Sequence, residues 1–335
     1  MLTAKLSRIP LAHLPTPLEE MTRLRAHLGE NCPRLFIKRD DQTGLATGGN
    51  KSRKLEFLMA EAQQQGADTV ITTGGPQSNH CRQTAAAAAR QGVNCVVVLN
   101  SDPIPREAWT GNILLDELLG AEICWASGRP PEEVMTEIAD ERRAAGAKPY
   151  IIPVGGSVPL GAAGYVLAVE EVAQQLAEQG VSVDRMVVTT GSYGTQAGIL
   201  VGVKALGLNC IVEGMNNSPD KDKTSDARQL TQDTATFLGL DLTITAEDIV
   251  IYDACGKHTY GVITDVECDV IRLLARTEGI LLDPVYTARA FGEMVNRIKA
   301  GHYRPDETLL FWHTGGLGGL FPRAAELLVN GSQTE

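Results

Sequence analysis

Short runs of β-branched and apolar residues alternate with alanine-rich stretches along most of this chain. The short runs have the length of buried strands, and the alanine-rich stretches have the length of helices. This alternation is typical of an α/β fold, in which open, twisted, mostly parallel sheets are flanked by helices on both faces. The expected strands are residues 68–73, 94–99, 121–125, 149–153, 185–189, 209–212 and 308–313.

The order of the elements predicts two sheets and two domains. Between residues 68 and 153 the strands are followed by expected helices at 81–91, 111–119 and 131–145. A second series has expected helices at 161–178, 195–206, 227–238, 264–277 and 288–300, with an irregular polar stretch at 216–226. We therefore expect a small α/β domain of residues 53–160, inserted into a large domain formed by residues 1–52 and 161–335.

The composition limits the partners of the protein. A net charge of -11 argues against nucleic acid or an anionic membrane as the main partner, because either would need a basic face. Seven cysteines contain no C-x-x-C pair, which indicates reduced thiols. No apolar run reaches the length of a signal peptide core or a membrane span. We expect a cytoplasmic protein that acts on a small molecule.

Lys51 follows a Gly-Gly-Asn turn that leads into a helix. An amine nucleophile needs access to a carbonyl and a depressed pKa, and Arg53 and Lys54 add positive charge nearby. Lys51 is therefore a candidate Schiff-base lysine. The alternative is a solvated lysine in a surface turn, so the assignment depends on other segments.

Four Gly-rich or polar breaks follow predicted strands, where open α/β sheets place their ligands: residues 74–80, 155–157, 191–195 and 314–316. The third break opens a helix, so its backbone N–H groups, its hydroxyls and the helix dipole converge on one anion. We predict a phosphate site formed by Gly191, Ser192, Tyr193, Gly194 and Thr195. The alternative is a tight turn that needs glycine for its backbone alone.

Four hydrogen-bonding side chains follow one another after the first strand: Gln77, Ser78, Asn79 and His80. Helix capping explains two of them, Ser78 and Asn79, but the full cluster is denser than a cap requires. We predict that these four residues contact a ligand. No two histidines have metal-ligand spacing, so we expect no metal site.

A nicotinamide dinucleotide site is an alternative, because Glu213 ends the next predicted strand where a ribose-binding acid would lie. Gly191, Gly194 and Gly198 form G-x-x-G-x-x-x-G, which differs from the dinucleotide pattern G-x-G-x-x-G. That alternative also leaves Lys51 without a role.

Seven motifs lie in order along the chain, at residues 14–18, 37–41, 48–57, 77–85, 191–198, 282–286 and 313–316. Together they resemble the family of 1-aminocyclopropane-1-carboxylate deaminase and D-cysteine desulfhydrase. The resemblance implies a pyridoxal 5'-phosphate enzyme of the tryptophan-synthase-β fold type (fold type II), usually a homodimer, with a small amino acid as substrate. Lys51 would bind the cofactor covalently, Asn79 would bond its pyridine 3'-oxygen, and residues 191–195 with Lys54 would hold its phosphate.

The resemblance also implies roles around the substrate. Ser78 would hold the substrate carboxylate or assist proton transfer, and Tyr260 and Tyr286 would line the reacting face. By residue type alone, tyrosines such as these two are more often packed aromatics whose hydroxyls are satisfied.

Thr287 and Thr314 separate the activities within the family. The deaminases typically carry Glu after the tyrosine that corresponds to Tyr286, whereas D-cysteine desulfhydrases and L-cysteate sulfo-lyases carry Thr and a later His-Thr-Gly-Gly. A hydroxyl near the ring nitrogen leaves the pyridine largely unprotonated, which suits a substrate with a good leaving group. Three departures leave the substrate open: Tyr193 in place of a small residue, Thr259 in place of Gly, and a short segment at 101–110.

We predict an α,β-elimination of D-cysteine or L-cysteate to pyruvate, ammonia and sulfide or sulfite. Lys51 would remove the Cα proton with Ser78 nearby. The alternatives are 1-aminocyclopropane-1-carboxylate deaminase, a pyridoxal-phosphate-dependent amino-acid racemase, a vitamin B6 binding protein and the nicotinamide oxidoreductase.

Overall fold

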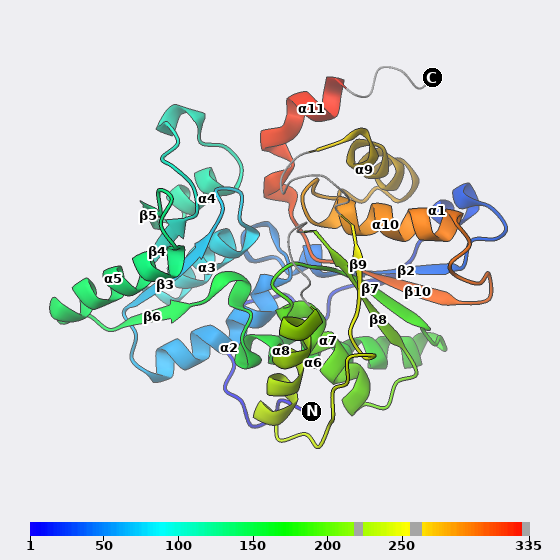
Figure 1. The fold of residues 1–335 in the computed structure, drawn as a ribbon, viewed down its shortest axis with the longest axis horizontal. Helices are drawn as coiled ribbons and strands as arrows, with labels where there is room; N and C mark the ends of the chain where they lie inside the picture. Colours follow the sequence, from blue (N-terminus) through cyan, green and yellow to red (C-terminus); the bar gives the residue numbers. More distant parts are fainter. Residues whose placement is uncertain (218–223, 255–262, 330–335) are drawn as a thin grey trace.

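The computed structural model describes residues 1–217, 224–254 and 263–329. Its strands form two sheets, which lie toward opposite ends of an elongated molecule (Figure 1). The strand order is β1-β2-β10-β7-β8-β9 in the large sheet and β5-β4-β3-β6 in the small sheet. Within the described ranges, every pairing is parallel except that of β1 with β2. The expected α/β class with two mostly parallel sheets is confirmed.

The small sheet contains β3 (Thr69–Gly74), β4 (Asn94–Leu99), β5 (Glu122–Trp125) and β6 (Pro149–Ile152). Its helices are α2 (Lys51–Gln64), α3 (Asn79–Gln91), α4 (Asn112–Leu118) and α5 (Pro131–Ala144). Alternate strand residues face opposite sides: Val97 packs with α2 and α3, whereas Val96 and Val98 pack with α5. The near-continuous apolar strands are therefore buried on both faces.

The large sheet contains β1 (Leu18–Glu20), β2 (Arg34–Arg39), β7 (Arg185–Thr190), β8 (Ile211–Asn216), β9 (Val250–Asp253) and β10 (Thr308–His313). Its helices are α1 (Thr22–Leu28), α6 (Pro159–Gln179), α7 (Gly194–Ala205), α8 (Thr224–Phe237), α9 (Asp265–Glu278) and α10 (Thr287–Lys299), followed by α11 (Ala324–Val329). Phe311 packs against α10, and Trp312 packs on the other face with α6.

Three strands and two helices were not expected from the sequence: β1, β2, β9, α1 and α11. The expected strand 209–212 was wrong in its bounds, because β8 extends through Glu213 to Asn216. Glu213 lies inside this strand, fully buried, and its carboxylate accepts hydrogen bonds from Arg185 at 2.6 Å and Tyr303 at 2.7 Å. The Glu213 carboxylate is therefore bonded within the protein, and it is not available to bind the ribose of a nicotinamide dinucleotide.

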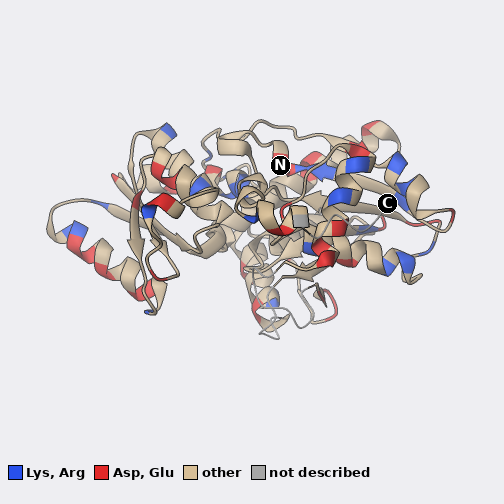
Figure 2. Cartoon of the chain, turned by 90° about the horizontal axis from the view of Figure 1, so that it is seen from above, with Lys and Arg blue, Asp and Glu red and all other residues tan. Residues whose placement is uncertain are grey.

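The predicted domain boundary at residues 52 and 53 falls in the first turn of α2, which packs against α6. The division into domains stays a prediction. None of the helices in the described ranges combines the length and apolarity that a bilayer crossing needs. Acidic and basic residues are interspersed at both ends of the molecule (Figure 2).

A buried carboxylate, that of Asp40, holds α2 against the large sheet. Its two oxygens accept hydrogen bonds from Arg53 at 2.9 Å, Thr16 at 2.8 Å, Tyr165 at 2.6 Å and Trp312 at 2.8 Å. Burial alone would raise the pKa of Asp40, but the Arg53 guanidinium beside it holds the pKa below its ordinary value. The charge is therefore retained in the interior, and α2 is fixed two residues beyond Lys51.

Replacing Asp40 with Asn should lower the free energy of unfolding by about 3–5 kcal/mol, because it removes the fully buried carboxylate beside Arg53 and leaves Glu171, which is nearer the surface, to balance the Arg53 charge. Urea denaturation of the purified chain measures the change. Asp41→Asn is the matched control: Asp41 pairs with Arg39 nearer the surface, where the loss should be below about 1 kcal/mol. Equal losses in the two variants would contradict a special role for the buried pair.

Candidate active site

Lys51 begins α2 after a tightly folded loop. Ala46 and Thr47 have positive φ angles of 43° and 70°, a conformation that strains residues with a Cβ. Gly48 has a φ of 77°, and a Cβ there would lie 2.0 Å from the Asp41 carbonyl oxygen. Lys51 is partly exposed, and desolvation lowers the pKa of its amine to about 8. A partly exposed amine with this pKa has a larger neutral fraction near physiological pH than an ordinary lysine, and the neutral amine can attack a carbonyl.

Lys54 lies in the interior beside the start of α7. Its Nζ donates to the Gly155 carbonyl oxygen at 3.1 Å and to Ser157 Oγ at 3.4 Å. Ser157 Oγ in turn donates to Ser192 Oγ at 2.8 Å. A Cβ on Gly194 would lie 2.8 Å from Lys54 Nζ. The ammonium group is therefore next to the N-terminus of α7, where backbone N–H groups and the helix dipole favour an anion.

Asn50 joins the lysine loop to the same helix. Its Nδ2 donates to Thr195 Oγ1 at 3.0 Å, and its backbone N–H donates to the Thr314 carbonyl oxygen at 3.0 Å. Tyr193 is the N-cap of α7 and has a left-handed backbone with φ of 60°. The structure thus brings the loops 48–50, 191–195 and 314–316 together, as the sequence predicted for a single site.

The charges of this site are unbalanced. Lys51 and Lys54 have no carboxylate partner within the described part of the chain. Desolvation and the Lys51 charge hold the pKa of Lys54 well below its ordinary value. The Thr189 and Thr190 hydroxyls, at the end of β7, are buried without a hydrogen-bond partner among the described residues. A phosphate at α7 would supply the missing negative charge, so the residues present fit a phosphate-bearing aldehyde.

The predicted polar cluster lies at the start of α3, and its members have different neighbours. Ser78 is the N-cap of α3, and its Oγ accepts a hydrogen bond from the Cys81 backbone N–H at 3.2 Å. His80 is buried, with Nε2 2.9 Å from the Thr72 hydroxyl. Burial, aided by the two nearby lysine charges, holds the pKa of His80 well below its ordinary value. His80 is therefore a neutral side chain next to the lysines.

Gln77 and Asn79 bond to the start of α4. Gln77 Nε2 donates to the Thr110 carbonyl oxygen at 2.9 Å, and Gln77 Oε1 accepts from the Asn112 backbone N–H at 2.9 Å. Asn79 Oδ1 accepts from Arg82 Nη1 at 2.7 Å and from Asn112 Nδ2 at 3.0 Å. Both ends of the Gln77 amide are thus used within the protein, and its contact with substrate stays a prediction.

The segment from Asp283 to Thr287 lies against the loop that follows β10. Thr287 Oγ1 donates to Asp283 Oδ1 at 2.7 Å and accepts from the Asp283 backbone N–H at 2.8 Å. The Thr287 hydroxyl is therefore engaged at the N-terminus of α10. Tyr286 is half-buried at the same helix end. A Cβ on Gly316 would lie 2.5 Å from Asp283, so this segment contacts the loop that follows β10.

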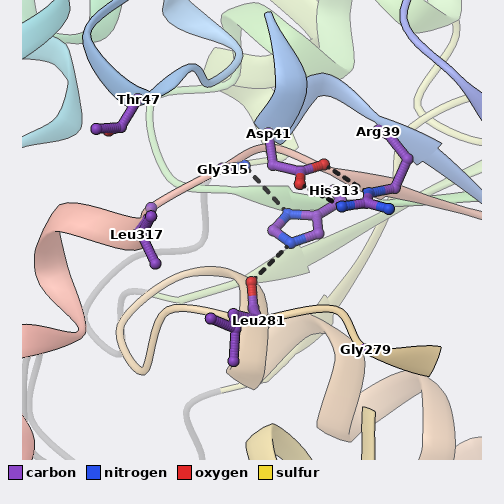
Figure 3. A pocket seen from close by; sticks show the side chains of 9 residues that line it. Arg39, Asp41, Thr47, Gly279, Leu281, His313, Gly315 and Leu317 are labelled. Atoms are coloured by element: carbon purple, nitrogen blue, oxygen red, sulfur yellow. Dashed lines mark hydrogen bonds and ion pairs between the residues drawn. The ribbon is translucent and has the colours of Figure 1, made fainter. Parts of the chain in front are cut away.

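A small cavity adjoins the loop after β10 (Figure 3). His313 Nδ1 accepts from the Gly315 backbone N–H at 3.2 Å, and His313 Nε2 lies 3.0 Å from the Leu281 carbonyl oxygen. Arg39 and Asp41, which line the cavity, pair at 2.8 Å. Its volume of about 180 Å³ is below the roughly 300 Å³ at which ligand pockets begin. His313 therefore holds two loops together, and this cavity is too small for the cofactor.

Asn50, Ser157 and Asp283 were given no role by the sequence prediction, although the motifs around them were singled out. Each adjoins a recognised motif, since Asn50 precedes the lysine, Ser157 ends a Gly-Gly-Ser break and Asp283 precedes Pro284. Asn50 and Ser157 bond to Thr195 and Ser192, which are distant in the sequence, so no local pattern identifies these bonds. Asp283 bonds locally, to the backbone of Val285 and Tyr286 and to Thr287. The predicted Tyr260 and the substitution Thr259 lie outside the described residues.

Comparison with known proteins decides the family. The pattern of the family described as "Pyridoxal-phosphate dependent enzyme" matches residues 9–315. The chain belongs to this family. It is 43% identical over 321 residues to a D-cysteine desulfhydrase of Klebsiella pneumoniae (strain 342), covering 94% of this chain and 95% of the relative. It is 38% identical over 331 residues to a putative 1-aminocyclopropane-1-carboxylate deaminase of Pyrococcus abyssi, covering 98% and 97%.

A solved structure described as an ACC deaminase homologue superposes with a TM-score of 0.89 at 37% identity, covering 98% of both chains. The predicted fold type II and the predicted dependence on pyridoxal phosphate are therefore confirmed. The roles of individual site residues stay predictions. Among the described residues, no group of three His, Cys, Asp or Glu side chains is arranged to hold a metal ion.

The pKa of Lys51 near 8 predicts how the family's cofactor reacts with the apoprotein. The amine is protonated below this pH and neutral above it, so the rate of covalent capture should rise up to about pH 8 and then level off. Rapid borohydride trapping, followed by mass spectrometry of the peptide containing Lys51, measures the rate. The rate of trapping at the exposed Lys148, measured in the same samples, is the control for the pH dependence of the reagents. A Lys51 rate that is independent of pH between 6 and about 9 would contradict the lowered pKa.

Proposed function

We propose that this enzyme is a carbon–sulfur lyase that eliminates the sulfur group of D-cysteine or L-cysteate. The observation that carries the proposal is 43% identity to a D-cysteine desulfhydrase over 94% of this chain. The low-pKa amine of Lys51, next to an anion-binding helix terminus, supports it. The products would be pyruvate, ammonia and sulfide or sulfite.

The loops around α7 would hold the cofactor. Backbone N–H groups from Gly191 to Thr195 and the ammonium of Lys54 would bind its phosphate, and Lys51 would bond its carbonyl carbon. Asn79 would bond the pyridine 3'-oxygen. When bound, pyridoxal phosphate supplies an electron sink that makes the Cα proton of the substrate acidic.

Lys51 would be the base of the reaction. Once the substrate amine has taken its place, the free Lys51 Nζ accepts the Cα proton, with Ser78 beside it. The Cα–H electron pair forms a Cα–Cβ double bond while the Cβ–S bond breaks and its electron pair leaves with sulfur. The released enamine consumes one water and yields pyruvate and ammonia. Tyr260 and Tyr286 would line the reacting face, and His80 and Gln77 would lie toward the substrate.

The ring nitrogen would face a hydroxyl. Thr287 donates its hydroxyl proton to Asp283, whereas the Thr314 hydroxyl has no hydrogen bond to any described residue and lies on the loop bonded to Asn50. We therefore assign the ring-nitrogen contact to Thr314, with Thr287 holding the segment through Asp283. A neutral hydroxyl partner leaves the pyridine largely unprotonated, which suits elimination of a good leaving group.

Deamination of 1-aminocyclopropane-1-carboxylate is the second candidate. The 38% identity to the Pyrococcus relative and the 0.89 TM-score to the ACC deaminase homologue favour it. A ring-opening reaction has no sulfur leaving group, so it calls for a stronger electron sink than a hydroxyl partner provides. We rank it below elimination for this reason.

A panel of D-cysteine, L-cysteine, L-cysteate, D-serine and 1-aminocyclopropane-1-carboxylate separates the two candidates. Pyruvate should form fastest from D-cysteine or L-cysteate, because sulfur leaves more readily than a ring carbon. Faster formation of 2-oxobutyrate from the cyclopropane substrate would overturn the proposal.

Lys51→Ala should abolish turnover of every substrate, since it removes both the covalent link and the base.

Thr195→Val should weaken cofactor binding by about 1.5–3 kcal/mol, the usual contribution of a hydrogen bond to a charged group. Equilibrium titration of the apoprotein with pyridoxal 5'-phosphate measures the dissociation constant. Thr136→Val, on the exposed face of α5, is the matched control and should leave that constant unchanged. An unaltered constant in Thr195→Val would mean that the phosphate binds elsewhere.

We also propose that the enzyme is a cytoplasmic homodimer and that residues 53–160 form its smaller domain. The family resemblance supports the dimer, and the low-pI composition with scattered cysteines supports the compartment. Light scattering coupled to size-exclusion chromatography tests the dimer.

A further inference from the structure

We infer that Arg82 and Asn112 are positioning residues that fix which end of the Asn79 side-chain amide faces the cofactor. This inference rests on the proposed function and deepens it, because it assigns to two residues outside the site a control over one cofactor contact. It also specifies the chemistry of that contact: Asn79 can only donate to the ligand.

The hydrogen bonds determine the orientation of the amide. Arg82 carries donors and no acceptor. Its Nη1 donates to Asn79 Oδ1 at 2.7 Å and to Asn112 Oδ1 at 2.6 Å. Because the Asn112 oxygen faces Arg82, the Asn112 Nδ2 is left to donate to Asn79 Oδ1 at 3.0 Å. The Asn79 oxygen thus accepts two hydrogen bonds, and the Asn79 Nδ2 points away from both donors.

The two supporting residues are themselves held firmly. Arg82 and Asn112 are both 0% exposed, so rotation of the Arg82 guanidinium or of the Asn112 amide would leave a buried polar group unpaired. Asn112 Nδ2 also donates to the Gln77 carbonyl oxygen at 2.8 Å, and the Asn112 backbone N–H donates to Gln77 Oε1 at 2.9 Å. The Gln77 amide bonds to the Thr110 carbonyl oxygen and to the Asn112 backbone N–H, so it holds the start of α4 in place. Gln77 therefore positions Asn112, and Asn112 positions Asn79.

The Arg82 guanidinium also links Asn79 to the loop before Lys51. Arg82 Nη2 donates to the Gly48 carbonyl oxygen at 2.8 Å, three residues before Lys51. A Cβ on Gly318 would lie 2.3 Å from Asn112 Oδ1, so the chain after β10 packs directly against Asn112 and Arg82. One guanidinium therefore sets the position of the lysine loop and the orientation of the Asn79 amide together.

The chemical consequence is a preference for an oxygen that carries no proton. An N–H donor stabilises the deprotonated 3'-oxygen of the cofactor, whereas an amide oxygen in its place would favour the protonated form. The protonation state of that oxygen sets the absorbance of the bound cofactor. The spectrum is therefore a readout of the amide orientation, independent of turnover.

Asn112→Asp is the sharpest test. The substitution keeps an oxygen for Arg82 but replaces the Nδ2 donor with a second oxygen, which repels Asn79 Oδ1 and favours the reversed amide. We expect the visible absorbance of the bound cofactor to move to shorter wavelength, and the cofactor dissociation constant to rise at least about 10-fold. Asn112→Ala, which removes the donor without adding charge, should shift both quantities in the same direction and carries the test if Asn112→Asp does not fold.

The control is Asn94→Asp, which adds the same charge at the exposed start of β4 and should leave the spectrum and the dissociation constant unchanged. In an Asn79→Ala background, both Asn112 substitutions should have no further effect on the spectrum, because the amide that they orient is gone. A wild-type spectrum in folded Asn112 variants, or an equal shift without the Asn79 amide, would overturn the positioning role. A wild-type protein that forms no visible band with pyridoxal 5'-phosphate would instead overturn the proposed function, and this inference with it.

Discussion

The buried charge pair of Asp40 and Arg53 is the interaction on which the geometry of the site depends. A carboxylate in the interior is stable only when its oxygens are satisfied, and those of Asp40 are bonded by Arg53, Thr16, Tyr165 and Trp312. These partners come from four distant parts of the chain. The Asp40 backbone also accepts a hydrogen bond from Gly49, so the pair orders the strained loop before the lysine as well as the helix after it.

The site concentrates positive charge within a protein of net charge -11. Desolvation lowers the pKa of both Lys51 and Lys54, and the Lys51 charge makes protonation of Lys54 less favourable still. The apoprotein therefore maintains an unfavourable arrangement that a bound dianion would relieve. The overall charge argued against polyanionic partners, but it carried no information about this local excess, which arises only when α2 and α7 pack together.

Long, periodic elements and contiguous motifs were predictable from the sequence. The buried strand β10 and the helix α7 follow from runs of apolar residues, and the proposed phosphate loop was inferred from glycines and hydroxyls within five positions. Short or charged strands such as β2 gave no clear pattern, because Lys38 is buried there through pairing with Glu171 on α6. The links through Asn50 and Asn112 could not be predicted, since each depends on a partner that only the fold brings into contact.

The two lysines lie on a single continuous helix, three positions apart. Neighbouring residues on an α-helix are separated by about 100° of rotation and 1.5 Å of rise, so positions three apart project from the same face about 4.5 Å apart along the axis. In the proposed site, this spacing would place one amine at the carbonyl and the other at the phosphate of a single ligand. Point substitutions between them preserve that spacing, whereas a single inserted or deleted residue would turn Lys54 away from α7. The residue types at positions 52 and 53 are constrained by their own bonds, to Gln83 and to Asp40, and the number of residues between the two lysines is constrained by the helix geometry.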